Sequence, residues 1–331
     1  MITAVPVDLA DAALAAEVRD GLKQVEQQLA DATRAEERLL TEASSHLIEA
    51  GGKRFRATLV LLASQFGDPT DERVVRAATA VELTHLATLY HDDVMDEAPL
   101  RRGHQSANSR WTNTIAILTG DFLFARASKF LAELGADAVR IQADTFARLV
   151  SGQVAETIGP APGQDPLDHY LYVVKEKTAS LVATAGRFGA MFSAAPDDVV
   201  NRIEPACEAI GVAWQLSDDI IDVASDTGQS GKTPGTDLRE GVRSLPVLHA
   251  LRSSRPGDTR LRELLDSADL TDQALHAEAL GLLRENPAMQ QARADLLRWA
   301  EVAREQIAGL PPGPARDAFE GMCGYVVDRT G

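Results

Sequence analysis

The sequence predicts an all-α fold, and three observations support this prediction. Apolar residues recur at helical spacing along most of the 331 residues, as in Leu83–Tyr90, where they follow the i, i+3, i+4, i+7 pattern. Alanine-rich stretches over residues 8–50, 74–97 and 114–158 favour helix. We find no clear alternating strand pattern, and no hairpin built on a tight Asn-Gly or Asp-Gly turn.

Connectors between the expected helices are marked by proline and glycine. These residues gather at 159–166, around Pro196, and at 228–235, 256–257 and 311–314. No Pro/Gly/Ser-rich linker divides the chain. We therefore expect residues 1–331 to form a single all-helical domain of about ten or more helices.

Composition and charge exclude several classes of protein. A hydrophobic fraction of 45% is ample for a large core. No stretch approaches the roughly 18 unbroken apolar residues of a membrane-spanning helix, and the N-terminus lacks a secretory signal. The two cysteines, Cys207 and Cys323, lack metal-ligand spacing, which favours a reducing cytoplasm. A net charge of −16 argues against nucleic-acid binding.

Two acidic motifs are the strongest chemical signal in the sequence. Each reads DDxxD at the C-terminal end of an apolar helical run; they comprise Asp92, Asp93 and Asp96, and Asp218, Asp219 and Asp222. The first and last aspartates of each motif stack one helical turn apart, where they repel each other and oppose the helix dipole. A bound cation would compensate, and Mg²⁺ commonly takes one or two carboxylates plus phosphate oxygens. A solvated helix end is the alternative, but two copies of one spacing disfavour it.

Cationic side chains near these motifs could bind phosphates. They are Lys53, Arg54 and Arg56 after Gly51-Gly52, Arg101 and Arg102, Lys177 beside Thr178, and Lys232. Each alone could merely solvate a helix face, but together they suffice for two diphosphates. His85 shares a helical stripe with Asp92, and on its own it has the pattern of a hydrogen-bonded core residue.

Five segments, in this order, closely resemble the trans (all-E) polyprenyl diphosphate synthases, which elongate isoprenyl chains. They are GGKRFR, ELTHLATLYHDDVMDEAPLRRG, EKTASL, WQLSDDIID and GKTPGTDLREG. The resemblance covers nearly the whole chain. It implies an isoprenoid-synthase-type helical bundle around a deep central cavity, usually as a homodimer. It also implies condensation of isopentenyl diphosphate with an allylic diphosphate such as geranyl, farnesyl or geranylgeranyl diphosphate.

The resemblance also implies residue roles. About three diphosphate-bridged Mg²⁺ ions would be held mainly by Asp92, Asp96 and Asp218, with Asp93, Asp219 and Asp222 supporting these ligands. Asp222 is also a candidate ligand in its own right. The allylic diphosphate would contact Arg101, Lys177, Thr178, Gln215 and Lys232. The isopentenyl diphosphate would contact Lys53, Arg56, His85 and Arg102, which makes His85 a ligand rather than a core residue.

The chemistry that follows is ionisation and condensation. Metal ions and cations neutralise the leaving diphosphate, and a dry apolar cavity protects the carbocation from water. The resemblance implies that the departing diphosphate takes the proton, and Ala224–Gly241 is a candidate lid. Two departures from the family pattern are Ala57 in place of proline, and Val242 in place of a lysine whose charge Arg243 could supply.

Product length depends on the helix below Asp92. The family stops growth early with bulky aromatics at the positions that here hold Ala87 and Thr88, and the two-residue insertion of many bacterial geranylgeranyl-type enzymes is absent. These small residues leave room for a growing chain, and one helical turn is close in length to the extension from one isoprene unit. We therefore expect a product of about seven to ten isoprene units. Such a product would suit a quinone side chain and could be released through peripheral membrane contact.

Several alternatives stay open on the sequence alone. They are a shorter-chain (farnesyl or geranylgeranyl) synthase, a terpene cyclase, a weakly active or non-catalytic subunit of a heteromeric synthase, and a helical scaffold. Cyclases typically replace the second DDxxD and inactive subunits lose aspartates, whereas this chain keeps all six.

Overall fold

The structure is a computed structural model, and it describes residues 9–225 and 234–330. Its first half contains α1 Ala12–Ala32, α2 Arg38–Glu49, α3 Phe55–Ala63, η1 Ser64–Phe66, α4 Glu72–Met95, β1 Leu100–Arg101, β2 His104–Gln105, α5 Ala107–Arg110, α6 Asn113–Leu134 and α7 Ala136–Ile158. Its second half contains α8 Pro166–Val173, the π-helix η2 Val174–Ala179, α9 Ser180–Phe192, α10 Asp197–Ala224, α11 Thr236–Arg239, α12 Leu245–Leu251, η3 Pro256–Asp258, α13 Thr259–Ser267, α14 Gln273–Arg284, α15 Ala288–Ile307 and α16 Pro314–Asp328.

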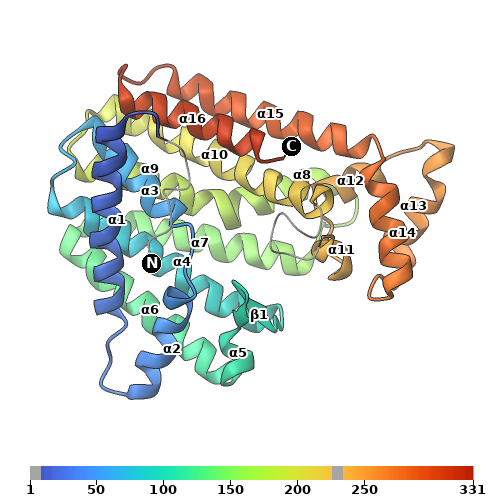
Figure 1. Cartoon of the computed structure of the whole chain (residues 1–331), viewed down its shortest axis with the longest axis horizontal. Coiled ribbons are helices and arrows are strands. Elements are labelled where there is room, and N and C mark those ends of the chain that lie inside the picture. The colour runs from blue at the N-terminus through green and yellow to red at the C-terminus, as the bar shows by residue number, and fades with distance from the viewer. Residues whose placement is uncertain (1–8, 226–233, 331) are drawn as a thin grey trace. The chain divides into compact units, whose positions relative to one another are not determined.

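The predicted all-α fold class is confirmed (Figure 1). The described residues contain a single small sheet, in which β1 pairs antiparallel with β2. This hairpin was not expected, because its turn is Arg102-Gly103, with φ of 54° and 77°, rather than Asn-Gly or Asp-Gly. Positive φ at both central residues gives the turn geometry that hairpins favour.

Contacts along the chain divide it into two compact units. Unit 1 comprises residues 1–147, 181–207 and 306–321, and unit 2 comprises residues 148–180, 208–305 and 322–331. The divisions fall within or at the ends of α7, α9, α10, α15 and α16. Each unit is described by itself below, and the expectation of a single domain stays a prediction.

Unit 1 packs helix backbones closely at glycines. A Cβ at Gly189 of α9 would lie 2.2 Å from the Val60 carbonyl oxygen of α3, and one at Gly120 of α6 would lie 3.1 Å from the Ala87 carbonyl oxygen of α4. Helix α4 is buried on most sides, since Val74, Leu83 and Tyr90 are all fully covered. Asp71 caps its N-terminus by accepting from the Arg73 N–H at 2.9 Å. The result is a rigid α4 that carries the first acidic motif on its last turn.

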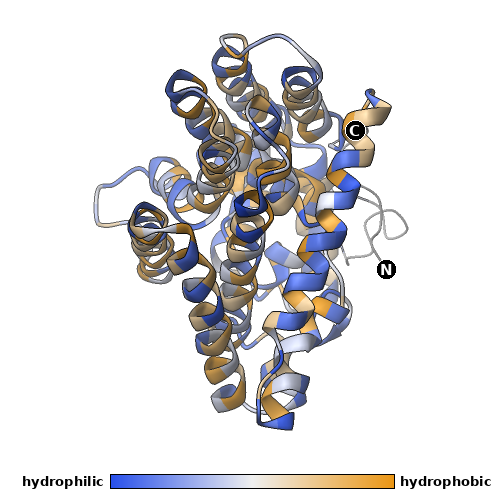
Figure 2. Cartoon of the chain, turned by 90° about the vertical axis from the view of Figure 1, so that its left-hand side faces the viewer, coloured by the Kyte–Doolittle hydropathy of each residue, from blue (hydrophilic) through white to orange (hydrophobic). Residues whose placement is uncertain are grey.

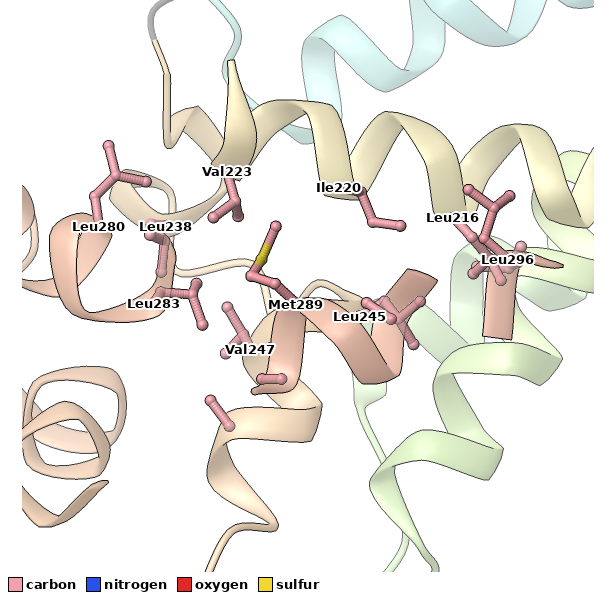
Figure 3. Close-up of a cluster of buried hydrophobic side chains, with 14 of the residues drawn as sticks. Leu216, Ile220, Val223, Leu238, Leu245, Val247, Leu280, Leu283, Met289 and Leu296 are labelled. Atoms are coloured by element: carbon pink, nitrogen blue, oxygen red, sulfur yellow. The ribbon is translucent and has the colours of Figure 1, made fainter. Parts of the chain in front are cut away.

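Unit 2 encloses a separate apolar core. In Figure 3, Ile220 and Val223 of α10 and Val247 of α12 point toward Met289 at the start of α15. Leu283 of α14 joins the same cluster. This core fixes the C-terminal turns of α10, which carry the second acidic motif.

Individual helices are striped by hydropathy, with apolar and polar residues on different sides (Figure 2). This is the pattern expected of helices that bury one face. None of the helices in the described residues is long and apolar enough to cross a membrane.

Candidate functional site

The first acidic motif occupies the last turn of α4. Asp96 is the C-cap residue, and its backbone N–H donates to the Asp92 carbonyl at 2.8 Å. Asp92 is partly buried and Asp96 is exposed. Their i, i+4 spacing places both carboxylates on one side of the helix, at the negative end of its dipole. The two carboxylates therefore share one side of α4, and their metal-binding role stays a prediction.

Asp93, between them, has a different environment. Its side chain is fully buried, and Oδ1 accepts from Arg101 Nε at 2.6 Å. Burial raises the pKa of Asp93 above its usual 3.8, although the Arg101 charge and hydrogen bond work in the opposite direction. Asp93 is thus positioned to hold Arg101 rather than to face a ligand.

The β1–β2 hairpin directs two arginines to different partners. Arg101 pairs with Asp93, whereas Arg102 Nη1 donates to the Leu47 carbonyl at 2.7 Å and also to the Gly51 carbonyl. The backbone of Arg102 lies in the left-handed region that non-glycine residues rarely adopt. Strain of this kind is typical of functional sites.

A group of arginines surrounds His85, which is partly buried on the same side of α4 as Asp92. Burial lowers the pKa of His85 well below 6.5, and the charges of Arg56, Arg102, Arg54 and Arg101 lower it further. The imidazole therefore stays neutral at pH 7. Such a concentration of positive charge suits a multiply charged anion.

Arg54 has a structural role that the sequence did not reveal. It is 6% exposed, its φ is 48°, and Nε contacts Glu26 Oε1 at 2.5 Å. This ion pair fixes the turn that leads into α3, with Lys53 exposed before it and Arg56 partly buried after it. The predicted cationic segment therefore contains one buried structural arginine, Arg54, between two more accessible cationic residues, whose role in binding isopentenyl diphosphate stays a prediction.

Gly52 packs against the guanidinium of Arg102, and this contact yields a prediction. A Cβ at Gly52 would lie 3.0 Å from Arg102 Cζ. We expect Gly52→Ala to raise the KM for isopentenyl diphosphate about tenfold with little change in kcat, because it displaces Arg102, which is predicted to bind that diphosphate in the ground state. Steady-state kinetics test this. Gly281→Ala, which meets nothing within 4 Å, is the control and should leave the KM unchanged. An unaltered KM in Gly52→Ala would contradict the role of Arg102.

In unit 2, the central aspartate of the second motif is again buried. Asp219 is 3% exposed and accepts from the Tyr170 hydroxyl at 2.5 Å, Gln215 Nε2 at 3.0 Å and the Leu245 N–H at 2.9 Å. Burial raises its pKa to about 6 in spite of these three hydrogen bonds. Gln215 also accepts from Thr178 Oγ1 at 3.3 Å, so two predicted allylic-site residues are linked to Asp219.

The outer aspartates of this motif differ in role. Asp222 accepts from the backbone N–H groups of Thr236 and Asp237 at 3.2 and 3.1 Å, so it holds the start of α11. Asp218 is 41% exposed and pairs with Arg329 near the chain end. The metal-binding role of Asp218 and Asp222 stays a prediction.

Lys177 and Thr178 lie in the π-helix Val174–Ala179, a feature frequent at functional sites. Arg148 anchors this turn, since it contacts Glu176 Oε2 at 2.8 Å and Glu208 Oε1 at 2.7 Å. Lys177 Nζ pairs with Glu156 of α7. The lysine predicted to bind the allylic diphosphate therefore has a carboxylate partner within unit 2.

The carboxylates of the first acidic motif suit Mg²⁺ better than a metal ion whose ligands all come from protein side chains. Within residues 9–225 and 234–330, no three His, Cys, Asp or Glu side chains gather as a metal site. Mg²⁺ keeps several waters and uses one or two carboxylates plus phosphate oxygens, which agrees with the Asp92 and Asp96 pair.

Two predictions concern the segment around 232–243. Lys232 lies outside the described residues, as does most of the loop in the proposed lid. Arg243, considered as a replacement for the family lysine at Val242, is exposed and lies 3.4 Å from Asp266. Among the residues that sequence reasoning missed are Tyr170, Glu156 and Arg329, none of which belongs to a recognisable motif.

The fold and the paired DDxxD motifs define the class of all-helical enzymes that act on isoprenyl diphosphates. Comparison with known families agrees: residues 37–283 match the model of the family described as "Polyprenyl synthetase". The chain belongs to this family. The resemblance inferred from the sequence is therefore confirmed.

Two relatives are similar to this chain over nearly their whole lengths. Nonaprenyl diphosphate synthase of Mycobacterium tuberculosis is 49% identical, over 98% of this chain and 97% of that protein. Heptaprenyl diphosphate synthase component 2 of Geobacillus stearothermophilus is 36% identical, over 94% and 96%.

Solved structures also match closely. Geranylgeranyl pyrophosphate synthase from Corynebacterium glutamicum, complexed with calcium and isoprenyl diphosphate, has a TM-score of 0.89 and 43% identity, covering 98% of this chain and 100% of that one. A decaprenyl diphosphate synthase from Rhodobacter capsulatus has a TM-score of 0.86 and 31% identity, covering 96% and 98%.

Proposed function

We propose that this protein is a Mg²⁺-dependent polyprenyl diphosphate synthase that adds isopentenyl diphosphate to an allylic diphosphate and releases a medium- or long-chain all-E product and diphosphate. The observation that carries the proposal is the doubled DDxxD motif, in which each central aspartate is buried and held by dedicated partners. The outer aspartates are more accessible than the central ones, since Asp96 is exposed and Asp92, Asp218 and Asp222 are partly buried.

The predicted site residues fall into three groups with different roles. Asp92, Asp96 and Asp218 would hold about three Mg²⁺ ions, which when bound would supply positive charge for the allylic diphosphate. Arg101, Lys177, Thr178, Gln215 and Lys232 would orient that diphosphate. Lys53, Arg56, His85 and Arg102 would hold the isopentenyl diphosphate, for which a neutral His85 can donate one hydrogen bond without adding charge. The departing diphosphate would accept the proton that restores the alkene.

Product length is proposed from the relatives and from α4. Nonaprenyl, heptaprenyl and decaprenyl synthases among the relatives favour a long chain. The geranylgeranyl synthase at 43% identity supports a shorter-chain enzyme as the second candidate. One relative is named "component 2", which supports a subunit of a heteromeric synthase as a further candidate.

The two positions of the predicted length gate are not equivalent. Thr88 is partly accessible and lies one turn below Asp92, on the same side of α4. Ala87 is 1% exposed. A growing chain that leaves Asp92 along this side of the helix would meet Thr88 first.

We expect Thr88→Phe to shorten the product by one or more isoprene units, because a unit extends about one helical turn of 5.4 Å. Chromatography of dephosphorylated products measures this. The matched Ala87→Phe variant should chiefly lower Tm, because overpacking a buried site costs about 1–3 kcal/mol. An unchanged product distribution in Thr88→Phe would show that this side of α4 does not limit product length.

The overall proposal is tested by incubating the purified protein alone with isopentenyl diphosphate, farnesyl diphosphate and Mg²⁺. A linear prenyl diphosphate supports it, a hydrocarbon indicates cyclisation, and no turnover indicates a subunit that needs a partner. We further propose a cytoplasmic homodimer. Exposed Ile117 and Leu118 of α6, at 43% and 54%, support such an interface, which sedimentation can test.

A further inference from the structure

An arginine at the end of the chain contacts the second acidic motif. Arg329 follows α16 directly, and its Nη2 donates to Asp218 Oδ1. The arginine side chain is 12% exposed, whereas that of Asp218 is 41% exposed. The guanidinium is therefore largely buried beside a carboxylate that remains accessible from another direction.

Other contacts fix this guanidinium in place. Arg329 Cζ lies 4.2 Å from the centre of the Trp214 ring, and Trp214 precedes Asp218 by one turn of α10. The Trp214 ring packs against Tyr325 of α16 at 6.2 Å. The next residue, Thr330, accepts from Arg293 Nη2 at 3.3 Å. A planar cation held over an aromatic face loses little freedom when it binds a carboxylate, so the arginine is pre-organised for Asp218.

This placement has an electrostatic consequence at the second motif. Asp218, Asp219 and Asp222 lie within two turns of one helix, and Arg329 supplies a positive charge that cannot be lost by deprotonation. A divalent cation that binds Asp218 must compete with this guanidinium or share the carboxylate with it. Arg329 Nη1 is buried and has no hydrogen-bond partner among the described residues, so Asp218 is the carboxylate that the guanidinium contacts there.

We propose that Arg329 is a built-in counter-ion of the second acidic motif, which neutralises Asp218 in the unliganded protein and weakens divalent-cation binding there until diphosphate arrives. The diphosphate brings negative charge for both the cation and the displaced guanidinium. Metal binding at Asp218 is then coupled to substrate binding. This inference rests on the proposed function, because it takes Asp218 as a metal ligand.

The test measures Mn²⁺ binding to the full chain, without substrate, by electron paramagnetic resonance. Arg329→Gln should bind Mn²⁺ about tenfold more tightly than the unaltered protein, because a nearby positive charge is removed. Arg329→Lys, which keeps the charge, should stay within about threefold of the unaltered protein. Arg316→Gln removes an arginine within α16 that lies 3.0 Å from Glu320, and it should leave Mn²⁺ binding unchanged. No gain in Arg329→Gln, or an equal gain in Arg316→Gln, overturns the proposal.

Two further variants separate this inference from the proposed function. Asp218→Asn should weaken Mn²⁺ binding, and in Asp218→Asn/Arg329→Gln the gain from the arginine change should vanish. If Asp218→Asn alone has no effect, the metal role of Asp218 fails, and with it part of the proposed function. If Asp218→Asn weakens Mn²⁺ binding but Arg329→Gln does not tighten it, the counter-ion role of Arg329 is wrong and the metal role of Asp218 stands. Should Arg329→Gln not fold, Trp214→Leu releases the guanidinium without removing it and should tighten binding about threefold; no tightening would again overturn the proposal.

Discussion

Asp92→Asn is expected to lower kcat about a thousandfold, which corresponds to about 4 kcal/mol of transition-state stabilisation. Asparagine keeps the shape of the side chain but removes the charge that holds the cation. The Mg²⁺ concentration that gives half-maximal rate should therefore rise as well. Initial rates of isopentenyl diphosphate incorporation, measured over a Mg²⁺ titration, give both quantities.

A matched control is available on the same helix. Asp71 caps the N-terminus of α4 through the Arg73 N–H, and asparagine caps equally well. Asp71→Asn should thus leave the rate and the Mg²⁺ dependence unchanged. Retention of kcat within tenfold in Asp92→Asn, with an unaltered Mg²⁺ dependence, would show that the first motif is not a metal site.

Most of the fold could be predicted because helical periodicity is a local property. The apolar spacing of Leu83–Tyr90 predicted a helix, and these residues lie in α4. The hairpin after it could not be predicted in the same way. Its strands have two residues each, and its turn places Arg102 at positive φ, which the residue type does not favour.

The acidic motifs were predictable for the same local reason, since i and i+4 side chains share a face wherever a helix forms. Their partners were not. Tyr170 lies 49 residues from Asp219, and Arg329 lies 111 residues from Asp218. Spacing cannot reveal such pairs, because tertiary packing brings them together. The difference in burial between a central aspartate and its more accessible neighbours likewise depends on what packs against each helix.

The ion pair between Arg101, whose side chain is 29% exposed, and the fully buried Asp93 leads to the largest expected change in stability. Arg101→Met leaves the fully buried Asp93 carboxylate without its cationic partner, and breaking such a pair costs about 3 kcal/mol or more. We expect the free energy of unfolding at pH 7.5, measured in urea, to fall by about that amount. Arg73→Met breaks a pair with the same 2.6 Å distance, in which the arginine is 46% exposed, and should change stability by no more than about 0.5 kcal/mol.

The pH dependence distinguishes a charge effect from lost packing. Burial already raises the pKa of Asp93, and losing Arg101 raises it further, so the folded variant takes up a proton more readily than the unfolded chain does. A group with a raised folded pKa contributes stability that is present at low pH and lost as the pH rises through that pKa. The deficit of Arg101→Met should therefore be largest at pH 7.5 and shrink as the pH is lowered toward 5. Asp93→Asn/Arg101→Met should recover much of the loss at pH 7.5, because no buried charge remains. A deficit that is constant with pH, and that the double variant does not relieve, would assign the effect to packing alone.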